Sequence, residues 1–362
     1  LPARMFNFDR NPDLDTSLFF HQPKEKVDVL MIHWITGLLT VEMIYRLHQH
    51  YQCPIIWLLM DMEPVTGGCH YAFDCTGYTR QCGNCPQIEP RGEFDVSREV
   101  WGKKKSLLQP LPITFVAANS NARGMIERSS LFGSHRIADI PVPLDDRIFR
   151  PFDQRAARDL LHVPVDARII FFGATSMEDP RKGIPELLVA LQQLWSRLEQ
   201  GRDAGGRSVV LLVAGRNGRL LIDKQPFPAV NIGYLRDDLT LALAYQAADL
   251  FVCPSVEDGG PMMIAEAMMC STPVVAFHSG MAPDLIRHLA NGYLARIRDA
   301  SDLAEGLLFL LSQPDLEAFR REALASAQSR HGPVAVMEEY VSLFEELKAD
   351  TKSSGKLSGC HR

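Results

Sequence analysis

Residues 248–277 read "ADLFVCPSVEDGGPMMIAEAMMCSTPVVAF", and this stretch decides the fold of the 362-residue chain. Its apolar run 248–255 predicts a buried strand, and the Met-rich segment 262–269 predicts an apolar helix. Pro261 marks the start of that helix, because proline is favoured in a first helical turn. A second apolar run, 272–277, predicts the next strand. Strand, helix and strand in this order form the repeating unit of a doubly wound α/β sheet.

The same alternation extends over most of the chain. Further buried strands are predicted at 27–34, 54–61, 113–119, 167–174 and 208–215, with amphipathic helical patterns between them. The proline-rich stretch 140–153 has no clean period, so we place a domain boundary near Asp145. The prediction is a domain at 1–145, a second at 146–330 and a disordered polar tail at 350–362. The first domain has few strands, which leads us to expect that it lacks one or two strand–helix units at its front.

Composition narrows the class of protein. The chain is 46% hydrophobic and 23% charged, as soluble globular proteins are, and its net charge of -6 gives no support for nucleic-acid binding. No apolar run is long enough to span a membrane. Several of the eight cysteines lie in or beside apolar runs, which suits a reducing cytoplasm.

The loop "VEDGG" at 256–260 has the features of a ligand site. It follows the carboxyl end of a predicted parallel strand, where open α/β sheets bind ligands. Gly259 and Gly260 let the backbone approach a ligand, and the free N–H groups of the helix start favour an anion such as a diphosphate. Asp258 and Glu266 stand about two helical turns apart, so both carboxylates can face one crevice. Carboxylates accept hydrogen bonds from vicinal hydroxyls, which makes sugar hydroxyls natural partners.

The stretch "PSVEDGGPMMIAEAMMCSTPVVAF" resembles the donor-binding motif of family-4 retaining glycosyltransferases. That resemblance implies the GT-B fold, in which two Rossmann-like domains face each other across a cleft. It also implies that Glu266 holds the ribose of a nucleotide and that Asp258, with Glu257 beside it, contacts the donor sugar. The backbone of Gly259, Gly260, Pro261 and Met262 is then expected to contact phosphate and sugar. The alternative for Glu266 is a helix cap or a surface salt bridge.

Two more segments carry the resemblance. "FFGATSMEDPRKGIPELLVAL" resembles the segment whose lysine grips the donor diphosphate, which here is Lys182 with Arg181 beside it. The family's usual arginine after Gly173 is replaced by alanine, so we expect Arg181 to substitute; a solvated turn is the alternative. Arg216 is a weaker phosphate candidate. "HGPVAVMEEYVSLFEEL" resembles the closing helix that crosses back to the first domain, expected at 331–349.

Four cysteines lie within the loop 66–90: Cys69, Cys75, Cys82 and Cys85. Four thiolates can close a tetrahedral metal site, and the final C-x2-C pair is a good chelate. Zinc is the expected metal in a structural role; an iron–sulfur cluster and free or disulfide-paired thiols are the alternatives. His70 lies between the thiols and is a substitute ligand. A subset of family-4 glycosyltransferases resembles this stretch.

That subset usually has a histidine directly before Asp61, where this chain has Met60, so a catalytic histidine is not carried over to that position. Asp61 and Glu63 are expected as acids of the acceptor cleft. His33 ends a predicted strand and either faces the cleft or is structural. The basic run "WGKKKSLLQ" at 101–109 is compatible with contact to anionic lipid, although such a run is more often a solvated helix face.

The resemblance implies a retaining glycosyltransferase that moves a sugar from a nucleotide-diphosphate sugar to a hydroxyl of a glycan or lipid-linked acceptor. No catalytic divalent metal is expected. The family's usual roles suggest bacterial surface polysaccharide synthesis by a cytoplasmic protein at the inner membrane face. A catalytically degenerate nucleotide-sugar binder or regulatory protein is the alternative, and another enzyme class on the same fold, such as an epimerase or phosphorylase, is a further one. A nicotinamide dehydrogenase is disfavoured, because no G-x-G-x-x-G motif follows an early strand.

Overall fold

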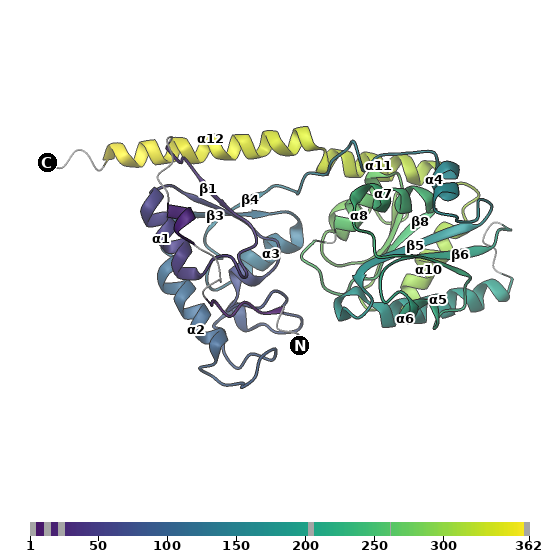
Figure 1. Ribbon diagram of the computed structural model, residues 1–362, viewed down its shortest axis with the longest axis horizontal. Coiled ribbons are helices and arrows are strands. Elements are labelled where there is room, and N and C mark those ends of the chain that lie inside the picture. The colour runs from purple at the N-terminus through teal and green to yellow at the C-terminus, as the bar shows by residue number, and fades with distance from the viewer. Residues whose placement is uncertain (1–4, 11–15, 21–25, 202–205, 261, 358–362) are drawn as a thin grey trace. The chain divides into compact units, whose positions relative to one another are not determined.

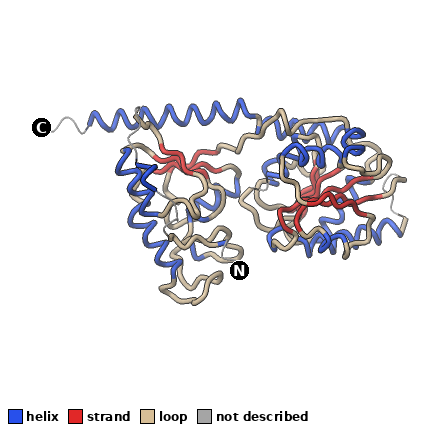
Figure 2. The backbone as a smooth tube through the Cα atoms, viewed as in Figure 1, coloured by secondary structure: helices blue, strands red, loops and turns tan. Residues whose placement is uncertain are grey.

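The protein was examined as a computed structural model that describes residues 5–10, 16–20, 26–201, 206–260 and 262–357. The chain divides into two compact units. Unit 1 comprises Leu1–Pro141 and Met337–Arg362, and unit 2 comprises Val142–Val336. Each unit is built on one parallel sheet with helices around it (Figures 1 and 2). The predicted α/β class with two parallel sheets is therefore confirmed, and the strand order reverses, as in a doubly wound sheet, in unit 2.

Unit 1 has a four-stranded sheet in the order β1-β2-β3-β4. The two central strands are buried throughout, and Trp57 and Phe115 stack between them with ring centroids 6.0 Å apart. Apolar residues on both faces of these strands explain why the sequence forms a helix-covered parallel sheet here. The elements are β1 (Leu30–Ile32), β2 (Ile55–Leu58), β3 (Ile113–Ala117), β4 (Arg136–Asp139), α1 (Val41–Tyr51), α2 (Val96–Lys103) and α3 (Ser120–Arg128).

Unit 2 has a six-stranded parallel sheet in the order β10-β9-β8-β5-β6-β7. Helices α5 and α10 cover one face, and α4, α7, α8, α9 and α11 cover the other (Figure 1). The strands are β5 (Arg168–Ser176), β6 (Val209–Arg216), β7 (Ala229–Gly233), β8 (Leu250–Cys253), β9 (Val274–Phe277) and β10 (Gly292–Ala295). The helices are α4 (Gln154–Leu160), α5 (Ile184–Glu199), α6 (Arg219–Ile222), α7 (Asp238–Ala247), α8 (Met262–Met269), α9 (Ala282–Leu285), α10 (Ala300–Leu311) and α11 (Glu317–His331).

The strand order of unit 2 reverses between β5 and β8. The chain runs from β5 outward through β6 and β7, and then returns to the other side of β5 to form β8. Such a reversal leaves the loops after the two neighbouring strands free to diverge, and ligands of doubly wound sheets bind at that point. The fold therefore directs attention to the loops that follow β5 and β8.

The last helix, α12 (Pro333–Leu357), begins in unit 2 and contributes to unit 1 from Met337. Within unit 1 it buries Tyr340, Leu343 and Leu347, and Lys348 bonds to Asp28 at 2.7 Å. The prediction of a disordered tail from residue 350 was wrong as far as Leu357, because adding turns to a helix already anchored by packing costs little. Residues 358–362 of that predicted tail lie outside the described residues. None of the described helices is long and apolar enough to cross a membrane.

Candidate functional site

The loops after β5 and β8 are locked together at the switch point of unit 2. The β5 loop contains the short 3-10 helix Pro180–Lys182, and the backbone N–H of Val256 donates to the carbonyl of Arg181 at 2.8 Å. Gly183 has a φ of 64°, and a Cβ added there would lie 1.9 Å from the carbonyl oxygen of Pro254. Only glycine allows this approach. The close backbone contact brings the lysine of one loop to the acids of the other.

The ammonium of Lys182 donates to Asp258 Oδ2 at 2.7 Å. The other carboxylate oxygen, Oδ1, accepts from the backbone N–H of Gly260 at 3.2 Å. Both side chains are largely buried, 18% exposed for Lys182 and 11% for Asp258. The two predicted residues, 76 positions apart, thus form one charged pair at the ends of neighbouring strands. A cation held in this position can approach an anionic ligand at the start of α8.

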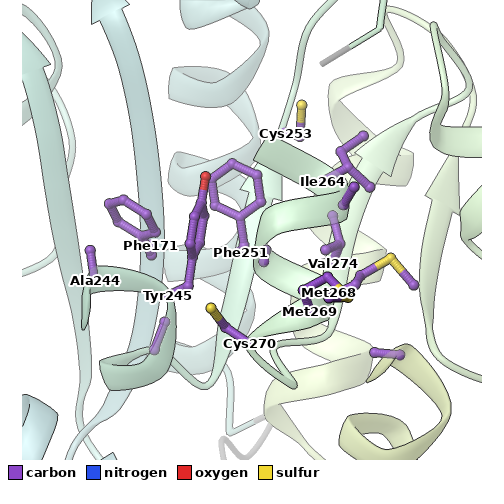
Figure 3. Close-up of a cluster of buried hydrophobic side chains, with 14 of the residues drawn as sticks. Phe171, Ala244, Tyr245, Phe251, Cys253, Ile264, Met268, Met269, Cys270 and Val274 are labelled. Carbon is purple, nitrogen blue, oxygen red and sulfur yellow. The ribbon is translucent and has the colours of Figure 1, made fainter. Parts of the chain in front are cut away.

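Glu266 lies in the second turn of α8 and accepts a hydrogen bond from the hydroxyl of Tyr245 at 2.8 Å. In Figure 3 the Tyr245 ring stands between Phe171 and Phe251, with its oxygen at the far end of the ring. Burial raises the pKa of Glu266 to about 7, although the Tyr245 hydrogen bond opposes the rise. Burial also raises the pKa of Tyr245 well above its usual value. Glu266 is therefore a half-buried carboxylate held by a tyrosine, and neither a helix cap nor a salt bridge is found for it among the described residues.

The remaining predicted residues of unit 2 lie at several different positions and have different partners. Arg181 forms an ion pair with Asp179 at 2.6 Å, so its guanidinium is held by its own loop. Arg216 ends β6 and lies over the ring of Tyr234 at 4.6 Å. A Cβ at Gly173 would come within 2.8 Å of the Met263 side chain, so this glycine lets α8 approach β5. The other predicted donor residues follow β8, with Glu257, Gly259 and Gly260 in its loop, Met262 at the start of α8, and Pro261 outside the described residues.

A polar pocket lies in unit 1 at the carboxyl ends of the neighbouring strands β1 and β2. The predicted cleft residues His33, Asp61 and Glu63 all line it. The other lining residues are Trp34, Ile35, Thr36, Met60, Pro64 and His70. This set is called the unit 1 pocket below. The sequence alone did not reveal that His70, considered earlier as a metal ligand, belongs here.

A hydrogen-bonded histidine–aspartate pair and a lysine–glutamate ion pair, both buried, build the unit 1 pocket. His70 Nδ1 lies 2.8 Å from Asp61 Oδ2, with both side chains almost fully buried. Lys104 Nζ lies 2.8 Å from Glu63 Oε1, and the Lys104 side chain is 0% exposed. His70 Nε2 faces the hydroxyl of Thr36 at 3.2 Å. Both ring nitrogens of His70 are thus engaged, which corrects its assignment as a substitute ligand beside the thiols.

The four predicted metal ligands lie in one loop of unit 1, and no disulfide joins them. Backbone N–H groups bond to three of the sulfurs: Gly77 to Cys75 at 3.4 Å, Gly67 to Cys82 at 3.2 Å, and Gln87 to Cys85. Cys69, Cys82 and Cys85 are buried. In the part of the chain that the structure describes, no group of three or more His, Cys, Asp or Glu side chains is arranged to hold a metal ion.

The basic run 101–109 is a structural segment. It forms the end of α2 and the π-helix Lys104–Leu108. Lys104 is buried, Lys103 pairs with Asp9 and Glu99, and Lys105 lies over the Trp101 ring at 4.9 Å. The prediction of a solvated basic face was therefore wrong for Lys104, because the buried Glu63 draws its ammonium inward.

Comparison with known proteins is consistent with this geometry. Residues 166–313 match the family described as "Glycosyl transferases group 1". The D-inositol 3-phosphate glycosyltransferase 2 of Catenulispora acidiphila is 28% identical over 228 residues, which are 59% of this chain and 52% of that protein. The D-inositol 3-phosphate glycosyltransferase of Mycobacterium bovis is 30% identical over 256 residues, 66% of this chain and 50% of that protein. The chain spans about half the length of the curated relatives it matches.

Solved structures share the fold at low sequence identity. The sucrose-phosphate synthase from Thermosynechococcus elongatus has a TM-score of 0.67 at 19% identity, covering 90% of this chain and 75% of that one. Anabaena Alr3699/HepE in complex with UDP and glucose has a TM-score of 0.60 at 16% identity, covering 87% and 78%. The fold is thus that of the GT-B glycosyltransferases, and residues 166–313, which include the Lys182–Asp258 pair and Glu266, are the part of the chain that matches the glycosyl transferases group 1 family.

Proposed function

We propose that this protein is a retaining glycosyltransferase that moves a sugar from a nucleotide-diphosphate sugar to an acceptor hydroxyl. The observation that carries the proposal is the Lys182–Asp258 pair at the switch point, in the loops that lead to α8, whose second turn carries Glu266. Such a donor requires a cation for its diphosphate, a carboxylate for its sugar and a second carboxylate for its ribose. The family match over residues 166–313 and the UDP and glucose named for one structural relative support the same donor class.

In this proposal the carboxylates bind the sugar parts of the donor. Glu266 accepts hydrogen bonds from the two vicinal ribose hydroxyls, because the Tyr245 hydroxyl occupies only part of its acceptor capacity. Asp258, with Glu257 beside it, contacts hydroxyls of the transferred sugar. The pairing of Asp258 with Lys182 fixes both groups before the donor binds. The loop 259–262 supplies backbone contacts to phosphate and sugar.

The diphosphate is the leaving group, and catalysis depends on stabilising the negative charge that develops on it. Lys182 and the N–H groups at the start of α8 stabilise that charge, with Arg181 contributing once it leaves Asp179. Retention by front-face attack, with the leaving phosphate as base, follows the family pattern. The role in bacterial surface polysaccharide synthesis and the location at the cytoplasmic membrane face stay predictions from the resemblance.

Slow donor hydrolysis tests the proposal without knowledge of the acceptor. The full chain is incubated with UDP-, GDP-, ADP- and dTDP-sugars, and release of the nucleoside diphosphate is followed by chromatography. A transferase releases one of them slowly, and Lys182→Ala abolishes the release. Arg197→Ala, which removes a partly buried cation of α5 that pairs with Glu305, is the matched control and keeps the release. Tight donor binding without any release would instead favour a degenerate nucleotide-sugar binder.

We also propose a structural zinc ion at Cys69, Cys75, Cys82 and Cys85. The four free thiols in this one loop support it, because thiolates are the ligands of structural zinc sites. Metal binding would draw the sulfurs together, since among the described residues no three ligands are already arranged for an ion. The ion would fasten a long loop with little regular structure. Metal analysis of the purified protein should find about one zinc per chain. Cys85→Ser should lose it, and Cys53→Ser, at a buried thiol outside the loop, should keep it. Iron with acid-labile sulfide would assign a cluster, and no metal would contradict the site.

A further inference from the structure

A second cavity of unit 1 lies at the opposite end of the sheet from the unit 1 pocket. Residues 52–54, 111–114 and 134–136, which lead into β2, β3 and β4, line it together with His48 of α1 and with Leu347 and Asp350 of α12. It therefore lies at the amino ends of three parallel strands, with the last helix of the chain as one wall. It is called the α12 cavity below.

The α12 cavity has the size and the wall of a small-molecule site. Its volume is about 510 Å³, within the roughly 300–1,000 Å³ that is typical of ligand pockets. Pro54, Leu111, Ile113 and Leu347 are buried apolar residues of its wall. An apolar ligand that displaces water from such a wall gains free energy from the hydrophobic effect. The cavity thus favours an organic molecule that is mostly apolar.

The charged groups of the α12 cavity are exposed to solvent. Among its described lining residues only Arg136 and Asp350 carry a full charge, and both are exposed. Arg136 already forms an ion pair with Glu346 of α12. A charged ligand would lose its hydration in the cavity without meeting a buried partner of opposite charge, which is costly. The arrangement of charges therefore favours an uncharged ligand.

His135 contributes a hydrogen-bond acceptor to the wall. Burial lowers the pKa of His135, so the ring is neutral at neutral pH, and the backbone carbonyls of Gln109 and Leu111 accept from its ring N–H. The other nitrogen, Nδ1, then carries the lone pair, and it has no hydrogen-bond partner among the described residues. Because the half-buried His135 lines the cavity, an N–H or O–H group of a ligand can supply the missing partner.

Rigid flat groups surround this acceptor. The His135 ring meets the Phe132 ring edge on, with centroids 5.1 Å apart, and the Phe115 ring at 6.2 Å. Pro54 and Pro112 add two rigid rings to the wall of the cavity. Aromatic molecules pack well against such faces and pair edge to face with neighbouring rings. The shape of the wall thus favours a flat ligand.

We propose that the α12 cavity binds a small uncharged aromatic molecule whose N–H or O–H group donates to His135 Nδ1 and whose ring packs against Pro54, Pro112 and Leu347. Such a ligand joins α12 to the sheet, because Leu347 belongs to the helix and the prolines precede β2 and β3. The cavity lies at the amino ends of its strands, whereas the proposed donor site follows the carboxyl ends of β5 and β8. The inference therefore does not rest on the proposed function.

Matched pairs of small aromatic compounds test the proposal on the full chain. Indole and phenol carry a donor, whereas 1-methylindole and anisole have a methyl group in place of its hydrogen, and benzoate is the charged comparison. Binding is followed by the shifts of backbone amide signals in heteronuclear NMR. Indole or phenol should shift the amides of Thr114 and Leu347. The methylated partner should bind roughly tenfold more weakly, the effect of losing one hydrogen bond, and benzoate should bind more weakly than phenol.

Three variants locate the bound molecule. Leu347→Trp fills the cavity from α12 and should abolish the binding. Val341→Trp places the same side chain at an exposed position of the same helix and should keep it. His135→Phe retains a ring but removes the acceptor, so it should remove the difference between each compound and its methylated partner. Circular dichroism shows whether each variant folds.

Three results would overturn the proposal. They are no amide shift with either indole or phenol, equal binding of the methylated and unmethylated compounds to the wild type, and binding that survives in folded Leu347→Trp. If Leu347→Trp does not fold, the comparison of the two pairs in the wild type and in His135→Phe still decides the question. A difference within the pairs that persists in His135→Phe would contradict the assignment of the acceptor.

Discussion

The hydroxyl of Tyr245 donates to the carboxylate of Glu266 across 2.8 Å, from one helix of unit 2 to the next. This bond joins a group buried in the apolar core to a carboxylate at the edge of the proposed donor site. It keeps Glu266 from turning away while leaving acceptor positions for a ligand. Burial of the same carboxylate gives the protein a measurable pH dependence.

Glu266→Gln should flatten the dependence of stability on pH. The pKa of Glu266 is raised from 4.5 to about 7 by burial, so the folded protein binds a proton that the unfolded chain has lost. Stability from this group is therefore full below pH 4.5 and falls as the pH rises toward 7. Glutamine keeps an acceptor for Tyr245 without the charge. Above neutral pH the variant should be more stable, by on the order of 2 kcal/mol after allowance for partial exposure.

Urea unfolding at a series of pH values measures this effect. Glu199→Gln, at an exposed position at the end of α5, is the control and should follow the wild-type curve. If the stability of Glu266→Gln depended on pH in the same way as that of the wild type, the carboxylate would titrate in its ordinary range. Water would then reach the Glu266 carboxylate.

Lys182→Ala should weaken the binding of nucleoside diphosphates much more than that of nucleosides. The proposed function assigns the lysine to the diphosphate, and a charge-assisted hydrogen bond contributes about 1.5–3 kcal/mol. Titration calorimetry with the preferred nucleoside diphosphate should show a loss of roughly 10- to 100-fold. The corresponding nucleoside, which lacks phosphate, should bind the variant and the wild type equally. Equal losses for both ligands would mean that the substitution disturbs the whole site and that Lys182 has no specific phosphate role.

The buried Lys104–Glu63 pair should matter more for stability than its exposed neighbour. Lys104→Met leaves the Glu63 carboxylate buried without its cation, which costs about 3–5 kcal/mol. Lys103→Met removes a lysine that is 42% exposed and should cost about 0–1 kcal/mol, although it breaks contacts to two acids. Denaturant unfolding of unit 1 compares the two variants. Similar costs would indicate that water reaches the Lys104–Glu63 pair.

The sequence predicted the central strands well because strands that are buried on both faces consist of continuous apolar runs. The strands it missed, β4, β7 and β10, are all at sheet edges. An edge strand is covered on fewer sides; β4, "RIAD", has no fully buried residue, so it lacks the apolar signal. These edge strands form because their backbone N–H and C=O groups bond to the neighbouring strand. Every sequence contains such backbone groups, so the side-chain pattern does not reveal where they pair.

The candidate sites were predicted in part for a similar reason. Asp258 and Glu266 were predicted from one short motif, and Lys182 was predicted from its resemblance to a second segment, 76 positions from Asp258. Their partners were not found, since Tyr245 lies 21 positions from Glu266 and nothing near it signals a contact. In unit 1 the His70–Asp61 pair arises where a loop folds back on the strand ends. Such long-range pairs depend on how the chain folds, and residue spacing alone does not encode them.

The most direct test of the central claim, a nucleotide-sugar site at the switch point of unit 2, is a thermal-unfolding screen against UDP-, GDP-, ADP- and dTDP-sugars. One nucleotide sugar should raise the unfolding temperature by several degrees, because a ligand that binds only the folded state stabilises it. The rise should vanish in Glu266→Ala and persist in Glu199→Ala. No rise with any of the donors, or a rise of equal size in Glu266→Ala, would contradict the claim.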